Sequence, residues 1–379
     1  MKAQFNRTTL VNATDLVKPA LPLKPTQPVL RGLKITVHDQ AATLSAFDQS
    51  TSITTRIPCD DNSAVAAEDG TVLVAGRVFA DIIHRLPNKP VVITATSSAV
   101  QITCGRSKVE LPALNLDDYP PLPDTPEQVG AINGHDLTKA ISAVATASSR
   151  DDTLPMLTGV KLIATDGKLT LAATDRFRMH MHHLDWDGDD LDLLLPARSL
   201  QDAARIIGSQ PAQILASDNR FGFTVGPTTI IGRVLDSDFP KVNSLIAKTC
   251  TTAARIGRQA MTDAAKRVAA IGDATTPLRL EFSHGEVTIS AQSNDTGSTS
   301  DVVDCGLLGE PMIISLHPGY LTDALASVGD DNVVFALNGT SSNPRPATVY
   351  PDSVIEDATE MATPTTDRVA LVMPVRLPG

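Results

Sequence analysis

Three segments of this chain repeat one sequence pattern at a constant spacing. They are "LVAGRVFADII" around Asp81, "LLPARSLQDAARI" around Asp202 and "SLHPGYLTDAL" around Asp323, and each lies 121 residues after the one before it. A second set, "ATLSAFD", "LTLAATD" and "VTISAQS", reads as the same alternating strand and recurs at steps close to a third of the chain. Self-similarity at a fixed period predicts three domains of one architecture.

The length agrees with this division, because 379 residues are too many for one compact core. Linkers are expected at the Pro-rich "YPPLPDTPEQ" (119–128) and at "AKTCTTAARIG" (247–257). The predicted domains are therefore 1–124, 125–251 and 252–379.

Each third contains two helical patterns separated by runs of alternating strand. The helical patterns have apolar residues at i, i+3, i+4 and i+7, which is typical of one buried face. Between them lie Val-, Ile- and Thr-rich segments broken by Gly, Asn, Asp and Ser. Strands that follow one another without a helix between each pair favour an α+β fold, with two helices packed on antiparallel sheets in each domain. Helices are expected within 5–24, 76–89, 134–152, 196–208, 255–273 and 317–331.

Charge is distributed unevenly between these helices and the rest of the chain. The formal net charge is −11, which argues against a protein that coats nucleic acid through clustered Lys and Arg. The six helical segments together carry +3, so the remainder carries −14. Weakly basic helices on an acidic body are compatible with a protein that surrounds nucleic acid, although ordinary scatter of surface charge is the alternative.

Composition indicates an intracellular protein without disulfides. The four cysteines are scattered with no CxxC spacing, so unpaired thiols are expected. No apolar run approaches the ~18 residues of a membrane span. The first residues lack the apolar segment of a secretory signal, so we expect a cytoplasmic location.

The segment "MHMHHLDWDGDDLD" invites two metal hypotheses. His180 and His182 share one face of a strand, but no third ligand is evident, and a solvated strand end is the preferred interpretation. Asp185, Asp187 and Asp189 open like a calcium loop, which then lacks its turn glycine and its final glutamate. We predict no metal and no cofactor.

Catalytic motifs are also missing from the sequence. No GxxxxGK[ST], GxGxxG, GxSxG or HExxH occurs, and no spacing indicates the paired carboxylates of an acidic hydrolase. We therefore predict no catalytic residues and a protein that is not an enzyme.

Four segments carry a specific family resemblance. "RDDTLPMLTG" (150–159), "AATDRFRM" (172–179), "LDSDFPKV" (235–242) and "LVMPVRLPG" (371–379) resemble signature segments of the bacterial DNA polymerase III beta subunit, the replication sliding clamp, with the actinobacterial branch nearest. "KPTQPVL" (24–30) is similar to another family segment, so the resemblance covers essentially the whole chain.

The resemblance implies a homodimer that pairs head to tail into a closed ring around double-stranded DNA. Twelve helices would line the hole and the sheets would form the outer wall. Such a ring holds DNA by topology, so sparse cations on the lining suffice to attract phosphates. Candidate DNA-facing cations are Lys24, Arg77, Arg150, Arg198, Lys266 and Arg267.

The resemblance further implies a hydrophobic pocket for short linear peptides that carry a Gln and large apolar residues. The implied partners are the DNA polymerase III alpha subunit, the clamp loader and other proteins with such motifs. The pocket would confer processivity by tethering the polymerase. The matching positions are Leu157, Thr174, Arg176, Phe177, Arg178, Met179, Pro240, Leu245, Pro346, Leu371, Met373 and Val375.

Ring closure would join an edge strand of the first domain to the third domain of a second copy. The matching residues are Val109 and Leu111 in the first domain, and Ala270 and Ile271 in the third. Val109 and Ala270 are smaller than the bulky residues common in the family. This leaves a second hypothesis open: a clamp-derived peptide-binding protein, or a second-copy clamp from a resistance or mobile element, with weakened ring closure.

Overall fold

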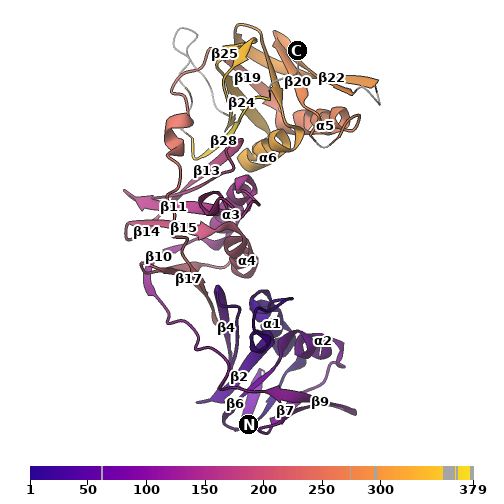
Figure 1. Cartoon of the computed structure of the whole chain (residues 1–379), viewed down its shortest axis with the longest axis vertical. Coiled ribbons are helices and arrows are strands. Elements are labelled where there is room, and N and C mark those ends of the chain that lie inside the picture. The colour runs from indigo at the N-terminus through magenta and orange to yellow at the C-terminus, as the bar shows by residue number, and fades with distance from the viewer. Residues whose placement is uncertain (61–62, 274, 294–296, 353–362, 364–365, 376–379) are drawn as a thin grey trace. The chain divides into compact units, whose positions relative to one another are not determined.

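The fold is described from a computed structural model, which separates into two compact units. Both units are built from helices separated by runs of several strands (Figure 1). The first unit is formed by residues 1–135 and 202–234, and the second by residues 136–201 and 235–379. The structure describes residues 1–60, 63–273, 275–293, 297–352, 363 and 366–375. The last four residues of the "LVMPVRLPG" segment lie outside the described residues.

The first unit contains one continuous antiparallel sheet with two helices beside it. The sheet runs in the order β10-β16-β17-β18-β4-β3-β2-β6-β9-β8-β7-β1-β5. Its helices are α1 (Arg7–Val17), α2 (Gly76–Arg85) and the short 3-10 helices η1 (Lys18–Ala20) and η2 (Pro28–Arg31). Its strands are β1 (Lys2–Phe5), β2 (Gly32–His38), β3 (Ala41–Phe47), β4 (Thr51–Pro58), β5 (Ala64–Glu68), β6 (Gly70–Ala75), β7 (Val91–Ala95), β8 (Ala99–Cys104), β9 (Ser107–Leu114), β10 (Glu127–Ile132), β16 (Ala212–Ala216), β17 (Arg220–Val225) and β18 (Thr228–Arg233).

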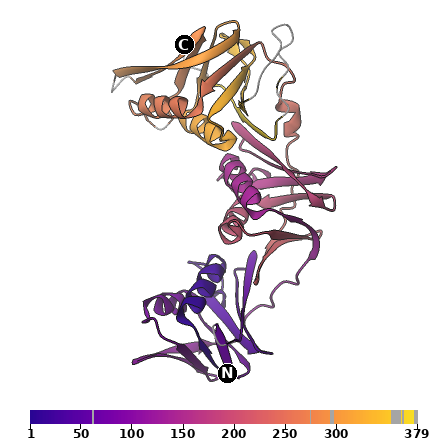
Figure 2. The ribbon, with the colours of Figure 1, turned by 180° about the vertical axis from the view of Figure 1, so that it is seen from behind.

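Helix α1 shows how local sequence and packing act together in this unit. It begins after Asn6, whose side-chain oxygen accepts hydrogen bonds from the backbone N–H groups of Thr8 at 2.9 Å and Thr9 at 3.4 Å. Its buried face carries Leu10 and Val17, both 0 % exposed. Helices α1 and α2 lie side by side on the same side of the unit (Figures 1 and 2). The apolar stripe predicted from the sequence is therefore the face that contacts the sheet.

The second unit repeats this arrangement with a sheet in the order β15-β11-β12-β13-β28-β27-β24-β19-β22-β21-β20-β23. The division of the chain between the two units falls within α3 (Gly134–Val144), after His135, and within α4 (Ala197–Ile207), before Asp202. The other helices are α5 (Arg258–Ala269), α6 (Pro318–Val328), η3 (Ala145–Ala147), η4 (Pro155–Leu157) and η5 (Val242–Leu245). The strands are β11 (Gly159–Thr165), β12 (Lys168–Thr174), β13 (Arg178–Asp185), β14 (Asp187–Gly188), β15 (Leu191–Pro196), β19 (Thr252–Gly257), β20 (Leu278–Ser283), β21 (Gly285–Ser293), β22 (Gly297–Gly309), β23 (Met312–Leu316), β24 (Asn332–Leu337), β25 (Gly339–Thr340), β26 (Asn343–Pro344), β27 (Ala347–Pro351) and β28 (Arg368–Val372).

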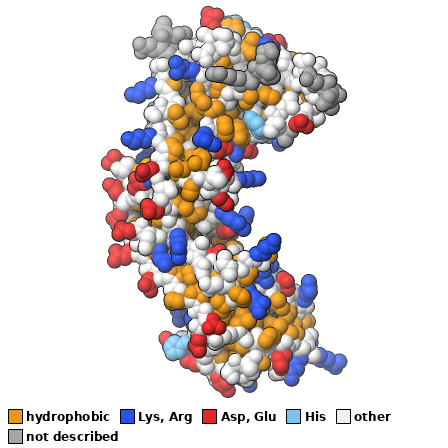
Figure 3. Space-filling model, in the orientation of Figure 1, with side chains coloured by type: hydrophobic (Ala, Val, Ile, Leu, Met, Phe, Trp, Pro, Cys, Tyr) orange, Lys and Arg blue, Asp and Glu red, His pale blue; other side chains and the backbone are white. Residues whose placement is uncertain are grey.

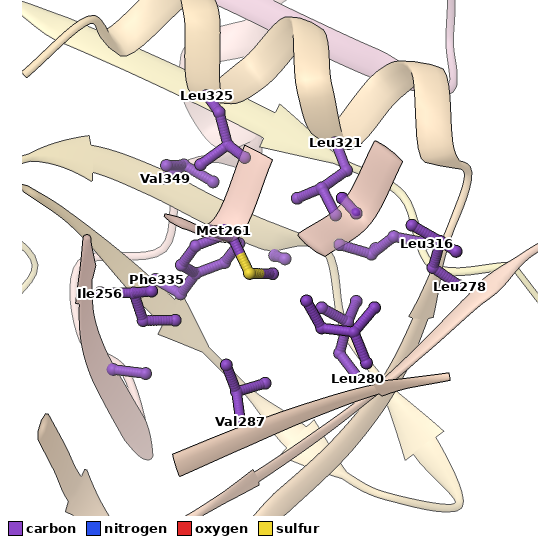
Figure 4. Packing of buried hydrophobic residues seen from close by; sticks show 14 of the residues in the cluster. Ile256, Met261, Leu278, Leu280, Val287, Leu316, Leu321, Leu325, Phe335 and Val349 are labelled. Carbon is purple, nitrogen blue, oxygen red and sulfur yellow. The ribbon is translucent and has the colours of Figure 1, made fainter. Parts of the chain in front are cut away.

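The largest core of the second unit lies between α5, α6 and the strands beneath them. Met261 of α5 and Leu321 of α6 point toward Leu280, Val287 and the other apolar side chains of the sheet (Figure 4). Each of these four side chains is 0 % exposed. Burial of a large aliphatic side chain contributes about 1.5–3 kcal/mol, so this layer is a main source of stability for the unit.

Antiparallel pairing also crosses the predicted domain boundaries. In the first unit β18 pairs with β4, for example Ile230 with Ile53. In the second unit β13 pairs with β28, for example Met179 with Leu371. Strands from predicted neighbouring domains therefore share one sheet in each unit, which removes an exposed strand edge at each junction.

The α+β class and all six predicted helices are confirmed. The linker predicted at 247–257 is wrong in its second half, because Thr252–Gly257 forms β19 between β22 and β24. Buried Thr252, Ala253 and Ala254 explain why this segment is ordered as a strand. Among the described residues no helix is long and apolar enough to cross a membrane.

Candidate functional site

Three exposed apolar side chains identify a candidate binding surface on the second unit. Phe177 is 53 % exposed, Leu245 52 % and Met373 37 %. The backbone N–H of Met373 donates to the carbonyl oxygen of Phe177 at 2.8 Å, so the end of β28 lies against the turn between β12 and β13. Leu245 ends η5, whose Val242 belongs to the buried cluster beneath this region. We call these residues, with Met179 and Leu371 beneath them, the apolar surface.

The floor of the apolar surface is rigid because it is built by paired strands. Met179 pairs with Thr174 on one side and with Leu371 on the other. Met179 and Leu371 are buried in one cluster with Val242, and Phe239 packs against that cluster. Met373 stands two residues after Leu371 and adds an exposed, flexible and polarisable side chain to the apolar surface.

The other residues predicted for the peptide pocket occupy different environments. Leu157 is buried at the end of η4, and Thr174 is buried, so neither offers much surface. Pro240 is exposed just before η5, and Pro346 directly precedes β27, which pairs with β28. The backbone N–H of Val375 donates to the carbonyl oxygen of Ser315 at 2.8 Å.

Arg178 is held at the edge of the apolar surface by groups that the sequence analysis did not assign. Its Nε donates to Asp175 Oδ2 at 3.0 Å, and its Nη1 donates to Asp323 Oδ2. Its guanidinium lies 4.6 Å from the ring centroid of Tyr320, a cation–π geometry. Tyr320 and Asp323 are three residues apart on α6, so both lie on one helix face. That spacing is the only sequence signal that could have indicated them.

Next to Tyr320, His317 acts as the N-cap of α6. Its Nδ1 accepts hydrogen bonds from the backbone N–H groups of Gly319 at 3.1 Å and Tyr320 at 3.4 Å. Burial lowers the pKa of His317, and the neighbouring Arg178 lowers it further. Nδ1 carries no proton while it accepts these two hydrogen bonds, and the ring stacks on Tyr320 with ring centroids 4.2 Å apart.

The prediction of a solvated strand end for His180 and His182 is wrong. His180 is 0 % exposed and His182 3 %. His180 Nδ1 lies 2.9 Å from the carbonyl oxygen of Ala143, and His182 Nε2 lies 3.1 Å from that of Ser327. Both imidazoles thus join β13 to neighbouring helices. Among the described residues there is no group of three or more His, Cys, Asp or Glu that could hold a metal.

The predicted DNA-facing cations are placed on helices or on the loops before them. Lys24 and Arg150 are exposed loop residues, and Arg198 is exposed on α4. Arg77 of α2 is half-buried and its Nε donates to the carbonyl oxygen of Leu21 at 2.8 Å. Lys266 and Arg267 occupy the last turn of α5, where Arg267 pairs with Asp301 at 2.7 Å, leaving Lys266 as the less compensated cation.

Acidic side chains gather elsewhere, on the strand side of the second unit. Figure 3 shows them over β11, β14 and β15. Asp185, Asp187, Asp190 and Asp192 are exposed in this region. Lys161 and Lys168 offset part of this charge through ion pairs with Asp192 and Asp185.

The residues predicted for ring closure lie on two exposed features. Val109 and Leu111 are half-buried on β9, which pairs with β8 from Ser107 to Pro112 and meets β6 only at its end. In the described pairing, one edge of β9 over those six residues has no partner strand. Ala270 caps the C-terminus of α5 and is exposed, and Ile271 packs against the core of the second unit.

Three family models match the chain in succession. They are the N-terminal, central and C-terminal domains of the DNA polymerase III beta subunit, at residues 1–123, 131–241 and 243–359. The chain belongs to the DNA polymerase III beta subunit family. Members of this family are sliding clamps, which are processivity subunits and not catalytic enzymes.

Individual relatives agree with the family. The chain is 34 % identical to the "Beta sliding clamp" of Streptomyces coelicolor, with 100 % of both chains covered. It is 31 % identical to the "Beta sliding clamp homolog GriR" of Streptomyces muensis, with 99 % of both covered. The crystal structure of the DNA polymerase sliding clamp from Bacillus subtilis superposes with a TM-score of 0.92 at 23 % identity, covering 100 % of this chain and 99 % of that one. The last comparison supports the clamp fold.

Proposed function

We propose that two copies of this protein close head to tail into a ring around double-stranded DNA and tether the replicative polymerase to it. The observation that carries this proposal is the apolar surface, which leaves Phe177, Leu245 and Met373 exposed over a buried floor within a chain of clamp architecture. Large apolar side chains exposed together at one place are typical of a protein-binding site. The ligands would be linear peptides of the polymerase alpha subunit, the clamp loader and other clamp-binding proteins.

The open edge of β9 supports ring closure. A strand edge with unpaired backbone groups is a template for pairing with another chain. Val109 and Leu111 would contact the region of Ala270 and Ile271 in a second copy. A closed dimer would contain two such interfaces. Lys24, Arg77, Arg150, Arg198, Lys266 and Arg267 would face the DNA. We place the domains at 1–124, 125–251 and 252–379, and the protein in the cytoplasm.

Retention on DNA of different topology tests the ring. The protein is loaded by its clamp loader onto nicked circular DNA. Half of the sample is then cut with a restriction enzyme, and the protein that remains bound to the circular and to the linear DNA is measured after gel filtration. A ring stays on the circle and slides off the linear ends. Equal retention on both forms would contradict encirclement and would indicate ordinary charge-based binding.

The peptide function is tested at Met373. Replacing Met373 with Asp places a charge on the apolar surface and should weaken binding of a Gln-containing apolar peptide by at least ten-fold, as measured by fluorescence polarisation. Leu308, an exposed apolar residue on β22, provides the control: Leu308→Asp should leave peptide affinity unchanged. Unchanged affinity in the Met373 variant would show that the peptide site is elsewhere.

The small residues Val109 and Ala270 favour one alternative, a clamp-derived peptide-binding protein that closes poorly. Small side chains bury less apolar area at an interface and so provide less stabilisation. Sedimentation at micromolar concentration separates the hypotheses. A dimer supports the ring, whereas a persistent monomer that still binds peptide supports the alternative.

A further inference from the structure

A groove of about 570 Å³ lies on the sheet of the first unit, where β18 pairs with β4. Volumes of about 300–1,000 Å³ are typical of small-molecule sites. None of the lining residues belongs to the apolar surface, to the predicted DNA-facing cations or to the residues predicted for ring closure. The residues that line the groove are Thr43, Thr54, Arg56, Pro58, Gly226, Pro227 and Thr229.

Strand pairing places the polar side chains of the groove on one face of the sheet. Thr43 of β3 lies directly opposite Arg56 of β4. Thr54 of β4 lies directly opposite Thr229 of β18. Because Thr54 and Arg56 are two residues apart on one strand, their side chains point to the same side. Three neighbouring strands therefore present three hydroxyls and one guanidinium together.

The turn between β17 and β18 forms a fixed wall of the groove. The backbone N–H of Arg56 donates to the carbonyl oxygen of Pro227 at 3.0 Å. Gly226 has a φ angle of +53°, a conformation that glycine adopts without strain. In the buried layer beneath, the hydroxyls of Thr55 and Thr228 lie 2.9 Å apart. The turn and β4 are thus joined, so the groove exists before any ligand binds.

The groups that face the groove retain hydrogen-bonding capacity. Arg56 is exposed, and no carboxylate in the described part of the chain lies within 4.0 Å of its guanidinium. The hydroxyl of Thr43 forms no hydrogen bond with the residues that the structure describes. Thr54 Oγ1 donates to Ser45 Oγ at 3.1 Å and can still accept. The hydroxyl of Thr229 has one long contact, of 3.5 Å, with a neighbouring threonine.

The nearby carboxylates are engaged with other groups. Burial raises the pKa of Cys59, and Asp60 and Asp69 raise it further, whereas Arg56 lowers it. Asp69 Oδ2 lies 3.0 Å from His38 Nδ1, and Asp60 Oδ1 accepts from a backbone N–H at 2.7 Å. Neither aspartate pairs with Arg56, whose guanidinium is therefore available to an anion.

The composition of the groove indicates one class of ligand. A guanidinium beside a free hydroxyl suits a phosphate group, which accepts several hydrogen bonds at once. The groove is larger than one phosphate, and threonine hydroxyls can donate to and accept from the hydroxyls of a sugar. The rings of Pro58 and Pro227 add apolar walls for its C–H groups. No lining residue in the described part of the chain is aromatic, so the stacking surface that a nucleobase prefers is missing.

We propose that this groove binds a phosphorylated sugar. Arg56 and Thr43 receive the phosphate, and Thr54 and Thr229 contact the sugar hydroxyls. This site depends neither on ring closure nor on the apolar surface. Loss of a charge-assisted contact in Arg56→Gln should weaken binding by about ten-fold or more, and Thr229→Val should weaken it by about two- to five-fold.

Isothermal titration calorimetry of the full chain, in a buffer without phosphate and at constant ionic strength, tests the proposal. The probes are glucose 6-phosphate, ribose 5-phosphate, glucose, inorganic phosphate and AMP. The variants are Arg56→Gln and Thr229→Val. The matched control is Arg233→Gln, which changes an exposed arginine at the end of β18, outside the groove. Urea unfolding of each variant checks that the first unit remains folded.

We expect at least one sugar phosphate to bind five-fold or more tightly than glucose, inorganic phosphate and AMP. Arg56→Gln should reduce this affinity, whereas Arg233→Gln should leave it unchanged. The proposal is overturned if neither sugar phosphate binds, if inorganic phosphate or AMP binds as tightly, or if Arg56→Gln binds like the unchanged protein. A variant that unfolds at lower urea is replaced by Arg56→Lys, which should retain part of the affinity because the charge remains.

Discussion

Mild acid should weaken the second unit through two histidines on β13. Burial lowers the pKa of His180 to about 4, and the pKa of His182 also falls to about 4 through burial and the nearby His180. Within the described part of the chain, the charged side chains that act on the pair are cations: Arg178 near His180, and Arg368 and Lys139 near His182. Hydrogen bonds of the two rings to the backbone carbonyl oxygens of Ala143 and Ser327 raise the pKa values, but by less than burial lowers them. Protonation of either ring is therefore unfavourable in the folded state.

The sign of the pH effect follows from proton uptake on unfolding. An unfolded histidine has a pKa near 6.5, so between about pH 6.5 and 4 the unfolded chain binds more protons than the folded unit. The contribution to stability is complete above the unfolded pKa and is lost as the pH falls toward the folded pKa. At pH 5 the loss is about 2 kcal/mol for each histidine, or about 4 kcal/mol for the pair, because one pKa unit corresponds to about 1.4 kcal/mol.

Urea unfolding followed by tryptophan fluorescence measures this loss in the relevant unit. The chain has one tryptophan, Trp186, which is 7 % exposed and follows β13 in the second unit. With a urea dependence of about 2–3 kcal/mol per molar, a loss of about 4 kcal/mol between pH 7.5 and pH 5 lowers the midpoint by about 1.5 M. Protein concentration is kept constant, because assembly would also shift the midpoint.

Variants distinguish these histidines from the other acid-sensitive groups of the protein. The double variant His180→Asn with His182→Asn keeps a hydrogen-bond donor at both positions and cannot titrate, so its midpoint should change much less between the two pH values. Met181→Leu is a change of one buried uncharged side chain that lies between His180 and His182 in the sequence. It should shift the urea midpoint by the same amount at pH 7.5 and at pH 5. An equal fall in the double variant and the unchanged protein would refute the reasoning.

The remaining predictions concern packing, a helix terminus and an ion pair. Met261→Ala removes a side chain that is 0 % exposed and should lower the free energy of unfolding by about 2–5 kcal/mol, whereas Lys266→Ala on the exposed face of α5 should change it by less than about 0.5 kcal/mol. Gly329 ends α6 at φ +80°, so Gly329→Ala should cost about 1 kcal/mol, seen as a lower midpoint in urea. Arg267→Gln removes an exposed pair with Asp301 and should cost at most about 1 kcal/mol, with a smaller effect at high salt.

The sequence predicted those parts of the fold that depend on local periodicity. Six apolar stripes became six helices because each stripe is a property of neighbouring residues. The strand at Thr252–Gly257 was missed because its order comes from pairing with β22 and β24, which follow far along the chain. Nothing local in "TAARIG" distinguishes such a strand from a linker.

The candidate site shows the same division between local and distant information. The turn at Arg176 and Phe177 could be located from its motif, but its partners on α6 could not. Arg178 and Asp323 are 145 residues apart, as are His182 and Ser327. The burial of His182 and the compensation of Arg178 both result from packing of α6 against β13, and single-sequence patterns carry no signal for that contact.

The internal repeat also allows the apolar surface to be compared with the matching place in the first predicted domain, the first copy of the repeat. One repeat step before Thr174, at the end of β3, stands Phe47, which packs with Leu73 and Tyr119 in a closed cluster. Tyr119 is only 8 % exposed, and burial raises its pKa to about 12. Its segment "LDDYP" therefore covers the first copy with its own aromatic side chain. In the second copy the related "LDSDFP" also places an aromatic side chain, Phe239, against the buried cluster. The exposed apolar residues of this copy therefore come from the segments that follow, Leu245 at the end of η5 and Phe177 in the turn after β12, and not from loss of the aromatic cover.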